Sequence, residues 1–365
     1  MSPVPSSRAD RLAEAAASAD LDAVLIGDMV RPGDSGREAM ADVTWLTGYG
    51  GTSGLAVVSP KGRWFVTDFR YLEVAGSTVP EGFEVVDGTA DLTKTVANLL
   101  DGYARVGVDE SRISVENHRK LSEAVGEGVS LTGAEGLLDG LRRVKDEAEI
   151  EAIAAAAALT DEVYAWLEDQ GFAGKTEREV ALAAEQKMRE LGAEGPSFPS
   201  IVAAGPNGSQ IHAVPGDRVI GAGEYIVIDM GAIVDGYCSD CTRTLVEGDP
   251  DPAQREVYEL VLASQLAALD AIKAGADGRD IDAISRDVIT EAGHGERFGH
   301  GLGHGVGIEV HEPPRLSKRS EDELQVGEVV TVEPGVYVPG EFGVRIEDLV
   351  VVTADGHRNL SSRPK

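Results

Sequence analysis

Short apolar runs alternate with amphipathic stretches through the first third of the chain. Apolar residues at helical spacing in the amphipathic stretches predict helices, and the compact apolar runs between them predict strands. Such alternation is typical of an α/β domain of modest size. The strands are expected at residues 21–26, 54–58, 64–67, 83–86 and 106–108, and the helices at 7–19, 91–100 and 115–125.

The pattern changes near residues 137–145, which we interpret as a charged connector. An alanine-rich helix is expected at 146–169 and another at 177–191, where Thr176 is the N-cap and Glu179 completes a capping box. In the rest of the chain helices come first and strands surround them, which predicts an α+β domain. The strands are expected at 225–230, 237–246, 329–333, 336–338, 343–347 and 349–353, and the helices at 253–272 and 280–292.

The length of 365 residues favours two domains over one core. We expect a smaller α/β domain at residues 1–137 and an α+β domain at 138–365. With 42% hydrophobic residues the chain is typical of a packed globular protein. It has no apolar run near the ~20 residues that cross a bilayer, and residues 1–20 do not resemble a signal peptide. A cytoplasmic protein is expected.

The formal net charge is −30, from 63 acidic and 33 basic residues. Such a surface repels nucleic acid and anionic membranes, so we expect neither as a partner. Only Cys238 and Cys241 could form a disulfide or a zinc knuckle. A structural zinc site needs a second ligand pair, and positions three apart in a strand face opposite ways. We interpret both cysteines as ordinary strand residues.

Two acids interrupt apolar strands in the second part of the chain. Asp229 ends the run Ile-Val-Ile, and Asp240 follows a turn expected at Asp235 and Gly236. Acids are depleted in strands and costly to bury. A solvent-facing position would explain one of them, but two on neighbouring strands suggest a common target.

A second pair of acids surrounds a predicted hairpin. Glu333 and Glu347 are equally far from Gly340, so a hairpin centred there places them opposite each other on one face. Bare carboxylates at that distance repel, which indicates a cation between them. Arg345 shares the Glu347 face, but one guanidinium does not balance four acids.

A glycine-rich segment carries three of the seven histidines: His300, His304 and His311. Its glycines exclude a stable helix, and the segment has no H-E-x-x-H motif. Four carboxylates and one imidazole can hold two divalent cations, with Mn²⁺, Co²⁺ or Fe²⁺ favoured by the oxygen-rich set. Two metals can polarise a carbonyl and lower the pKa of a shared water from about 15.7 towards about 7, which is hydrolysis chemistry. Neither a G-x-S-x-G motif nor a paired cysteine nucleophile is found.

The chain resembles the pita-bread metallopeptidases, which include methionine aminopeptidase, aminopeptidase P and prolidase. The resemblance is carried by IDMGA, SDCTRT, GHGLGHGVG, HEPP, TVEPGVY and VRIEDLVV. It implies a C-terminal pita-bread domain, a smaller creatinase-like α/β domain before it, and a pair of metal ions, Mn²⁺ first, with Co²⁺, Zn²⁺ or Fe²⁺ as alternatives. The metal ligands that it implies are Asp229, Asp240, His304, Glu333 and Glu347.

The α/β domain expected at residues 1–137 narrows the resemblance to the proline-directed members of the family. Those members carry such a domain, whereas methionine aminopeptidases lack it. Segments WLTGYGG and VTDFRY are similar to parts of it. The resemblance implies a homodimeric Xaa-Pro peptidase that acts on short peptides with proline in second position. By the same resemblance His212, His300, His311 and Arg345 bind substrate or orient the acids, Tyr337 supports Arg345, and His212, His311 and Glu333 are catalytic. Ile211 departs from the proline common in the family.

Three alternatives stay open at this point. Metal-free creatinase-like hydrolases and non-catalytic binding proteins share the fold but lose the ligands, all of which are present here. Within the peptidase interpretation, no sequence feature separates a dipeptidase from an aminopeptidase.

Overall fold

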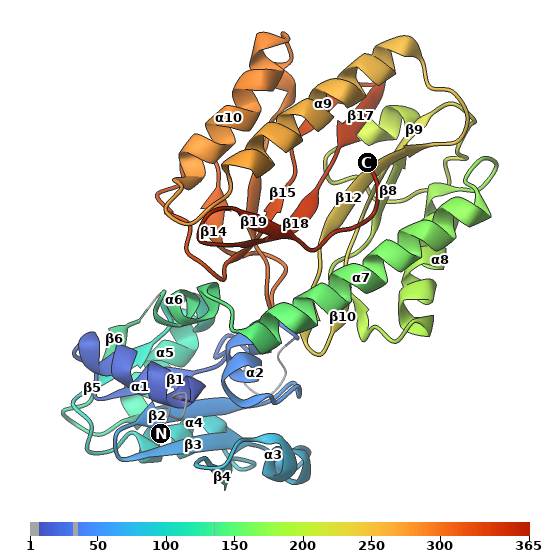
Figure 1. Ribbon diagram of the computed structural model, residues 1–365. Coiled ribbons are helices and arrows are strands. Elements are labelled where there is room, and N and C mark those ends of the chain that lie inside the picture. The colour runs from blue at the N-terminus through green and yellow to red at the C-terminus, as the bar shows by residue number, and fades with distance from the viewer. Residues whose placement is uncertain (1–6, 32–35, 135) are drawn as a thin grey trace, which may run out of the picture. The chain divides into compact units, whose positions relative to one another are not determined.

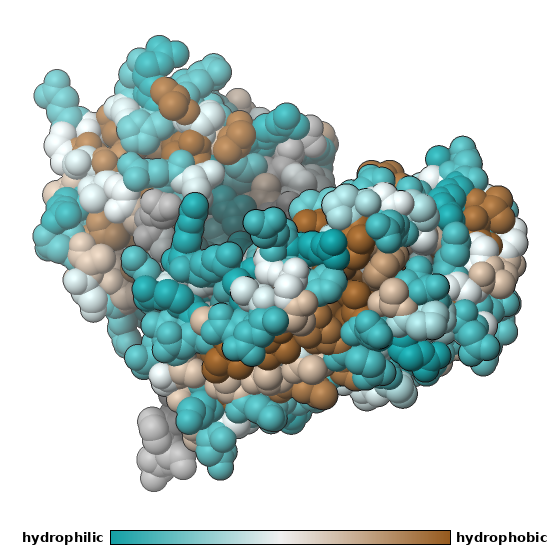
Figure 2. All heavy atoms as spheres, turned by 90° about the horizontal axis from the view of Figure 1, so that it is seen from above, coloured by the Kyte–Doolittle hydropathy of each residue, from teal (hydrophilic) through white to brown (hydrophobic). Residues whose placement is uncertain are grey.

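A computed structural model of the protein describes residues 7–31, 36–134 and 136–365 (Figure 1). The chain divides into two compact units, Met1–Arg142 and Arg143–Lys365. No helix in the described ranges is both long enough and apolar enough to span a bilayer. Hydrophilic side chains cover most of the face seen in Figure 2, in keeping with the net charge of −30.

The first unit is built on a mixed six-stranded sheet in the order β4-β3-β2-β1-β5-β6. Its central strand β1 (Ala23–Ile26) pairs antiparallel with β2 (Leu55–Ser59) and parallel with β5 (Arg105–Val108). Apolar side chains of these strands form the core with α4 and α5. The other elements are β3 (Gly62–Thr67), β4 (Glu84–Asp87), β6 (Ser130–Gly133), α1 (Arg8–Ser18), α2 (Ala41–Thr47), α3 (Leu72–Thr78), α4 (Leu92–Leu99), α5 (Val115–Ala124), and the 3₁₀ turns η1 (Glu38–Met40) and η2 (Glu110–Arg112).

The stretch expected as a charged connector is a helix, α6 (Leu137–Arg143), so that interpretation was wrong. Arg142 on this helix is buried and donates to the buried Asp42 at 2.6 Å. A charge that suggested an exposed linker therefore belongs to an internal ion pair.

In the second unit, one core lies between two helices and a three-stranded sheet in the order β12-β9-β8. The helices are α7 (Glu147–Gln170) and α8 (Glu177–Glu190). The Thr176 and Glu179 capping box predicted for α8 is confirmed. The strands are β8 (Ile201–Ala204), β9 (Tyr225–Met230) and β12 (Cys241–Val246).

A second core in this unit lies between α9 (Pro252–Ala271), α10 (Gly278–Glu291) and the strands that follow them. A five-stranded sheet has the order β14-β13-β15-β18-β19, and β16 pairs with β17. The glycine-rich segment is not wholly a loop, because it contains β13 (Gly303–Gly305). The other elements are η4 (Gly295–Arg297), β14 (Glu312–Leu316), β15 (Val329–Val332), β16 (Gly335–Val338), β17 (Phe342–Arg345), β18 (Asp348–Val352) and β19 (His357–Asn359).

The strand expected at 237–246 is broken at Ser239 and Asp240. Its first part, β11 (Tyr237–Cys238), pairs with β10 (Ala232–Val234), which also pairs with β7 (Gly195–Pro196), and only the second part, β12, pairs with β9. The break follows from a close backbone approach, since a Cβ on Gly231 would come within 1.9 Å of the Ser239 carbonyl oxygen. The predicted turn is confirmed, with positive φ at Asp235 and Gly236.

Candidate metal centre

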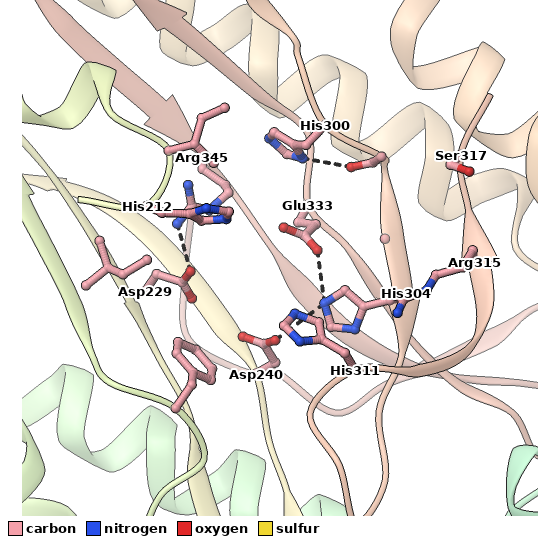
Figure 3. A pocket seen from close by; sticks show the side chains of 15 residues that line it. His212, Asp229, Asp240, His300, His304, His311, Arg315, Ser317, Glu333 and Arg345 are labelled. Atoms are coloured by element: carbon pink, nitrogen blue, oxygen red, sulfur yellow. Dashed lines mark hydrogen bonds and ion pairs between the residues drawn. The ribbon is translucent and has the colours of Figure 1, made fainter. Parts of the chain in front are cut away.

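Asp229 and Asp240 come from neighbouring stretches of one sheet. Thr242 lies opposite Asp229 in the β9–β12 ladder, and Asp240 directly precedes the first pair of that ladder. The strand break therefore places Asp240 at the end of β12 and not within it. Both acids line one pocket (Figure 3).

Glu333 and Glu347 lie across a gap in a continuous antiparallel register. On one side of the gap Val332 pairs with Asp348, and on the other Gly335 pairs with Arg345. The two glutamates are therefore opposite each other, as expected from their symmetry about Gly340. Neither glutamate belongs to a strand.

His304 on β13 completes the cluster. Its Nε2 lies 3.2 Å from Glu333 Oε1 and 3.6 Å from Asp240 Oδ2. Ligand atoms of Asp240, His304 and Glu347 lie within 4.8 Å of one another, and all three side chains are buried. These atoms converge closely enough to coordinate one cation.

Burial raises the pKa of Asp229, and it raises the pKa of Asp240 and Glu347 far more because neighbouring carboxylates add repulsion. Burial also acts on Glu333, but the hydrogen bond and charge of His304 outweigh it and bring the pKa of Glu333 to about 2. The four acids therefore do not all carry a charge at neutral pH unless cations compensate them.

Two buried carboxylate oxygens of the cluster have no hydrogen-bond partner among the described residues: Asp229 Oδ1 and Glu347 Oε1. Leaving a buried acceptor unsatisfied costs about 1–3 kcal/mol. Coordination to a cation would satisfy both oxygens. The donor set, four carboxylates and one imidazole, thus fits two divalent ions with oxygen-rich coordination.

Arg345 connects the acids to His300 through Tyr337. Its Nη2 donates to Asp229 Oδ2 at 2.7 Å and its Nη1 donates to the Tyr337 hydroxyl at 2.9 Å. That hydroxyl lies 2.9 Å from His300 Nε2, and His300 Nδ1 lies 2.7 Å from the Gly301 carbonyl. A carbonyl only accepts, so Nδ1 carries the proton and Nε2 accepts from Tyr337. Burial lowers the pKa of His300, which favours this neutral ring.

Two further histidines line the same pocket of about 400 Å³ (Figure 3). The His311 ring meets the His304 ring edge-on, with centroids 4.5 Å apart. Burial and the neighbouring His304 lower the pKa of His311 to about 4, so it is neutral at pH 7. His212 is exposed, and no hydrogen bond of its ring is found among the described residues. All the residues expected at the site except Glu347 and Tyr337 line this pocket. Glu347 has a ligand atom within 4.8 Å of those of Asp240 and His304, and the Tyr337 hydroxyl lies 2.9 Å from His300 Nε2.

Sequence reasoning missed several residues of the site. Thr242 Oγ1 donates to Glu347 Oε2 at 2.8 Å and accepts from Arg345 Nε at 3.0 Å. Phe198 and Ile201 form an apolar part of the pocket wall, and Arg315 from β14 adds a cation. No residue type or spacing marks these positions, because their proximity depends on how separate strands pair.

Both cysteines are buried, and neither is part of a disulfide. Cys238 Sγ donates to the Ile308 carbonyl at 3.3 Å, whereas Cys241 Sγ donates to the Glu347 carbonyl at 3.7 Å. They therefore interact with different segments and do not converge on a shared ligand.

Two parts of the chain match known protein families. Residues 150–354 match metallopeptidase family M24, and residues 8–144 match the creatinase/prolidase N-terminal domain. The chain belongs to metallopeptidase family M24. Members of this family are typically dinuclear metal enzymes, and the fold is the expected pita-bread domain preceded by a creatinase-like domain.

Individual relatives cover nearly the whole chain. An uncharacterised peptidase of Bacillus subtilis, YqhT, is 39% identical and covers 89% of this chain and 92% of its own. A solved Xaa-Pro dipeptidase from Bacillus anthracis is 36% identical with a TM-score of 0.91, over 98% of this chain and 97% of its own. An X-Pro aminopeptidase from Thermotoga maritima is also 36% identical with a TM-score of 0.86, over 96% and 98%.

Proposed function

We propose that this peptidase uses two divalent cations, Mn²⁺ in the first instance, to hydrolyse the bond between an N-terminal residue and proline in a dipeptide. The observation that carries the proposal is the convergence of Asp240, His304 and Glu347 beside the unsatisfied oxygen of Asp229. The names of the two solved relatives support proline-directed cleavage. We also expect a homodimer that acts in the cytoplasm.

Bound cations would supply Lewis acidity and a water of lowered pKa. Glu333, held by Thr331 Oγ1 at 3.1 Å, is the carboxylate placed to take up a proton and pass it to the leaving nitrogen. His311, neutral at pH 7, donates a ring N–H to the oxygen of the scissile carbonyl. His212 contacts the substrate next to the scissile bond.

Arg315 favours a dipeptide over a longer peptide. Its side chain is exposed at the pocket, on the side of His304 and His311 away from Asp229 (Figure 3). Neither a hydrogen bond nor an ion pair of its guanidinium is found among the described residues. A free α-carboxylate on proline would pair with this guanidinium, and a charge-assisted hydrogen bond contributes about 1.5–3 kcal/mol.

Part of the pocket wall is apolar. It is formed by Phe198, Ile201 and Ile211. Ile201 pairs directly with Asp229 across the β8–β9 ladder. An apolar first residue is therefore preferred over an acidic one, which would face both the apolar wall and the carboxylates.

The decisive experiment compares Leu-Pro, amidated Leu-Pro and Leu-Pro-Ala as substrates of the manganese-loaded enzyme. We expect Leu-Pro to be cleaved with the highest kcat/KM. Arg315→Met should lower kcat/KM for Leu-Pro by about 10–100-fold and leave the value for amidated Leu-Pro within twofold. Equal cleavage of all three substrates would instead indicate an aminopeptidase, and metal loading without any cleavage would indicate a binding protein.

A further inference from the structure

A buried carboxylate joins the two ends of the segment that carries His212. Glu177, the first residue of α8, is 1% exposed. The segment begins with η3 (Gly205–Ser209) and continues irregularly to Gly216. Glu177 is far from His212 in sequence and does not line the pocket.

The Glu177 carboxylate accepts hydrogen bonds from both ends of this segment. Oε1 accepts from the Ala204 backbone N–H at 2.9 Å, before the segment, and Oε2 accepts from the Gly216 backbone N–H at 3.2 Å, after His212. Asn207 Nδ2 lies 3.1 Å from each oxygen. One side chain thus joins the two ends of the segment, which we call the first stem (at Ala204) and the second stem (at Gly216).

The position of His212 depends on this backbone. His212 is exposed, and no hydrogen bond of its ring is found among the described residues, so the backbone of the segment largely sets where the ring lies. The first stem has one more anchor, because Gly208 packs against Gly343 so closely that a Cβ on Gly343 would come within 1.9 Å of the Gly208 carbonyl oxygen. The second stem is held at Gly216 by Glu177 and by the Arg178 N–H, which donates to the Gly216 carbonyl at 3.0 Å.

We propose that Glu177 is a positioning residue that sets the reach of His212 into the pocket by joining the two stems of its segment. This inference rests on the proposed function and adds to it a residue outside the pocket. A carboxylate is required, because two oxygens must face three donor groups. Glutamine would turn one N–H₂ towards a donor and leave that donor unsatisfied.

The test is a double-mutant cycle of Glu177→Gln with His212→Ala, read as kcat/KM for Leu-Pro. If Glu177 acts through His212, Glu177→Gln lowers kcat/KM by about tenfold in the wild-type background and by less than twofold when His212 is already alanine. The loss should appear mainly in KM, with metal content unchanged. An equal loss in both backgrounds overturns the proposal, since Glu177 would then act on the fold in general.

The control is Glu247→Gln. Glu247 also accepts two backbone N–H groups, from Phe172 at 2.6 Å and Ala173 at 2.8 Å, but these belong to the loop between α7 and α8 and not to the His212 segment. The Glu247→Gln variant should leave kcat/KM for Leu-Pro unchanged. Glu177→Asp, which keeps the charge and shortens the side chain, serves if Glu177→Gln does not fold.

Amide hydrogen exchange separates this inference from the proposed function. Glu177→Gln should speed exchange of residues 204–216 by about tenfold without affecting β15 or β18. If the wild-type enzyme cleaves no Xaa-Pro peptide, the proposed function fails, and exchange alone then decides whether Glu177 holds the segment. Unchanged exchange would overturn the inference even in an active enzyme.

Discussion

The Arg345 guanidinium lies 2.7 Å from Asp229 Oδ2, and this leaves Asp229 Oδ1 as the free, buried oxygen that faces the pocket. One planar cation holds three groups, since Nη1 bonds Tyr337 and Nε bonds Thr242. Its geometry therefore fixes which oxygen of Asp229 remains available for a metal.

Arg345→Lys should lower metal affinity or kcat/KM by about 10–100-fold, because one ammonium cannot bond all three groups at once. Isothermal titration with Mn²⁺ and steady-state kinetics measure the two effects. Arg279→Lys is the matched control, since Arg279 lies on α10 with an exposed partner 3.7 Å away. If Arg345→Lys matched Arg279→Lys in both metal affinity and kcat/KM, the role given to Arg345 would be contradicted.

Removal of metal should destabilise the second unit, because four clustered acids, of which Asp240 and Glu347 are buried, then lose their compensating charge. A cation present at about 100 times its Kd contributes about 2.7 kcal/mol, and this corresponds to a fall in Tm of about 5–10 °C. Calorimetry before and after dialysis against a chelator measures the shift, with elemental analysis as control. Mn²⁺ should restore both Tm and activity; an unchanged Tm after complete removal would argue against a resident metal pair.

Substitution of both cysteines should leave the metal content unaltered. Cys238 and Cys241 bond to different carbonyls, and burial raises the pKa of Cys241 well above its usual range, which disfavours the thiolate that a metal needs. Cys238→Ala with Cys241→Ala should cost about 1 kcal/mol each in the free energy of unfolding. Loss of bound metal from this variant would revive the zinc alternative.

The buried pair of Asp282 and Arg286 on α10 should be important for stability. Arg286 Nη2 lies 2.7 Å from Asp282 Oδ1 and also donates to the His300 carbonyl at 2.8 Å. Arg286→Met leaves a buried carboxylate unpaired, which should cost about 3–5 kcal/mol in urea unfolding. Replacing Asp282 by leucine in the same chain should recover part of that loss. A single variant as stable as the wild type would show that the pair contributes little.

The ion pair of Arg218 and Glu224 should give a pH-dependent contribution. The hydrogen bond from Arg218 lowers the pKa of Glu224, so the stabilisation is present above the unfolded pKa of about 4.3 and is lost as pH falls through the folded pKa. Glu224→Gln should cost up to about 1 kcal/mol at pH 7, because the pair is partly exposed. Urea unfolding at several pH values should show the stability difference between Glu224→Gln and the wild type shrinking as the pH falls below about 4.3. A difference that grows in acid would reverse the sign assigned here.

The sequence predicted the positions of metal-site acids where spacing along the chain determines how two strands pair. Symmetry about Gly340 predicted that Glu333 and Glu347 are opposite, and the ladders on both sides of the gap have that register. The break before Asp240 was not predictable in this way. It depends on Gly231, which lies between β9 and β10 and admits the Ser239 carbonyl only because it has no side chain.

Supporting residues were also beyond reach of the sequence. Glu177 and Arg286 act on backbone groups of distant segments, and a backbone amide or carbonyl has no residue type to recognise. The connector expected at 137–145 was wrong for a similar reason, since Arg142 finds its carboxylate at Asp42, early in the chain. Charge alone does not distinguish a solvated arginine from a paired one.

The uninterrupted register around Glu333 and Glu347 restricts how this hairpin can change length. Side chains of a strand alternate between its two faces, so one residue inserted between Glu333 and Val338, or between Phe342 and Glu347, would turn one glutamate away from the other. Extra residues at the tip beside Gly340, where φ is 74°, leave both strands in register. Insertions and deletions should therefore be tolerated at the tip of this hairpin and nowhere else along it.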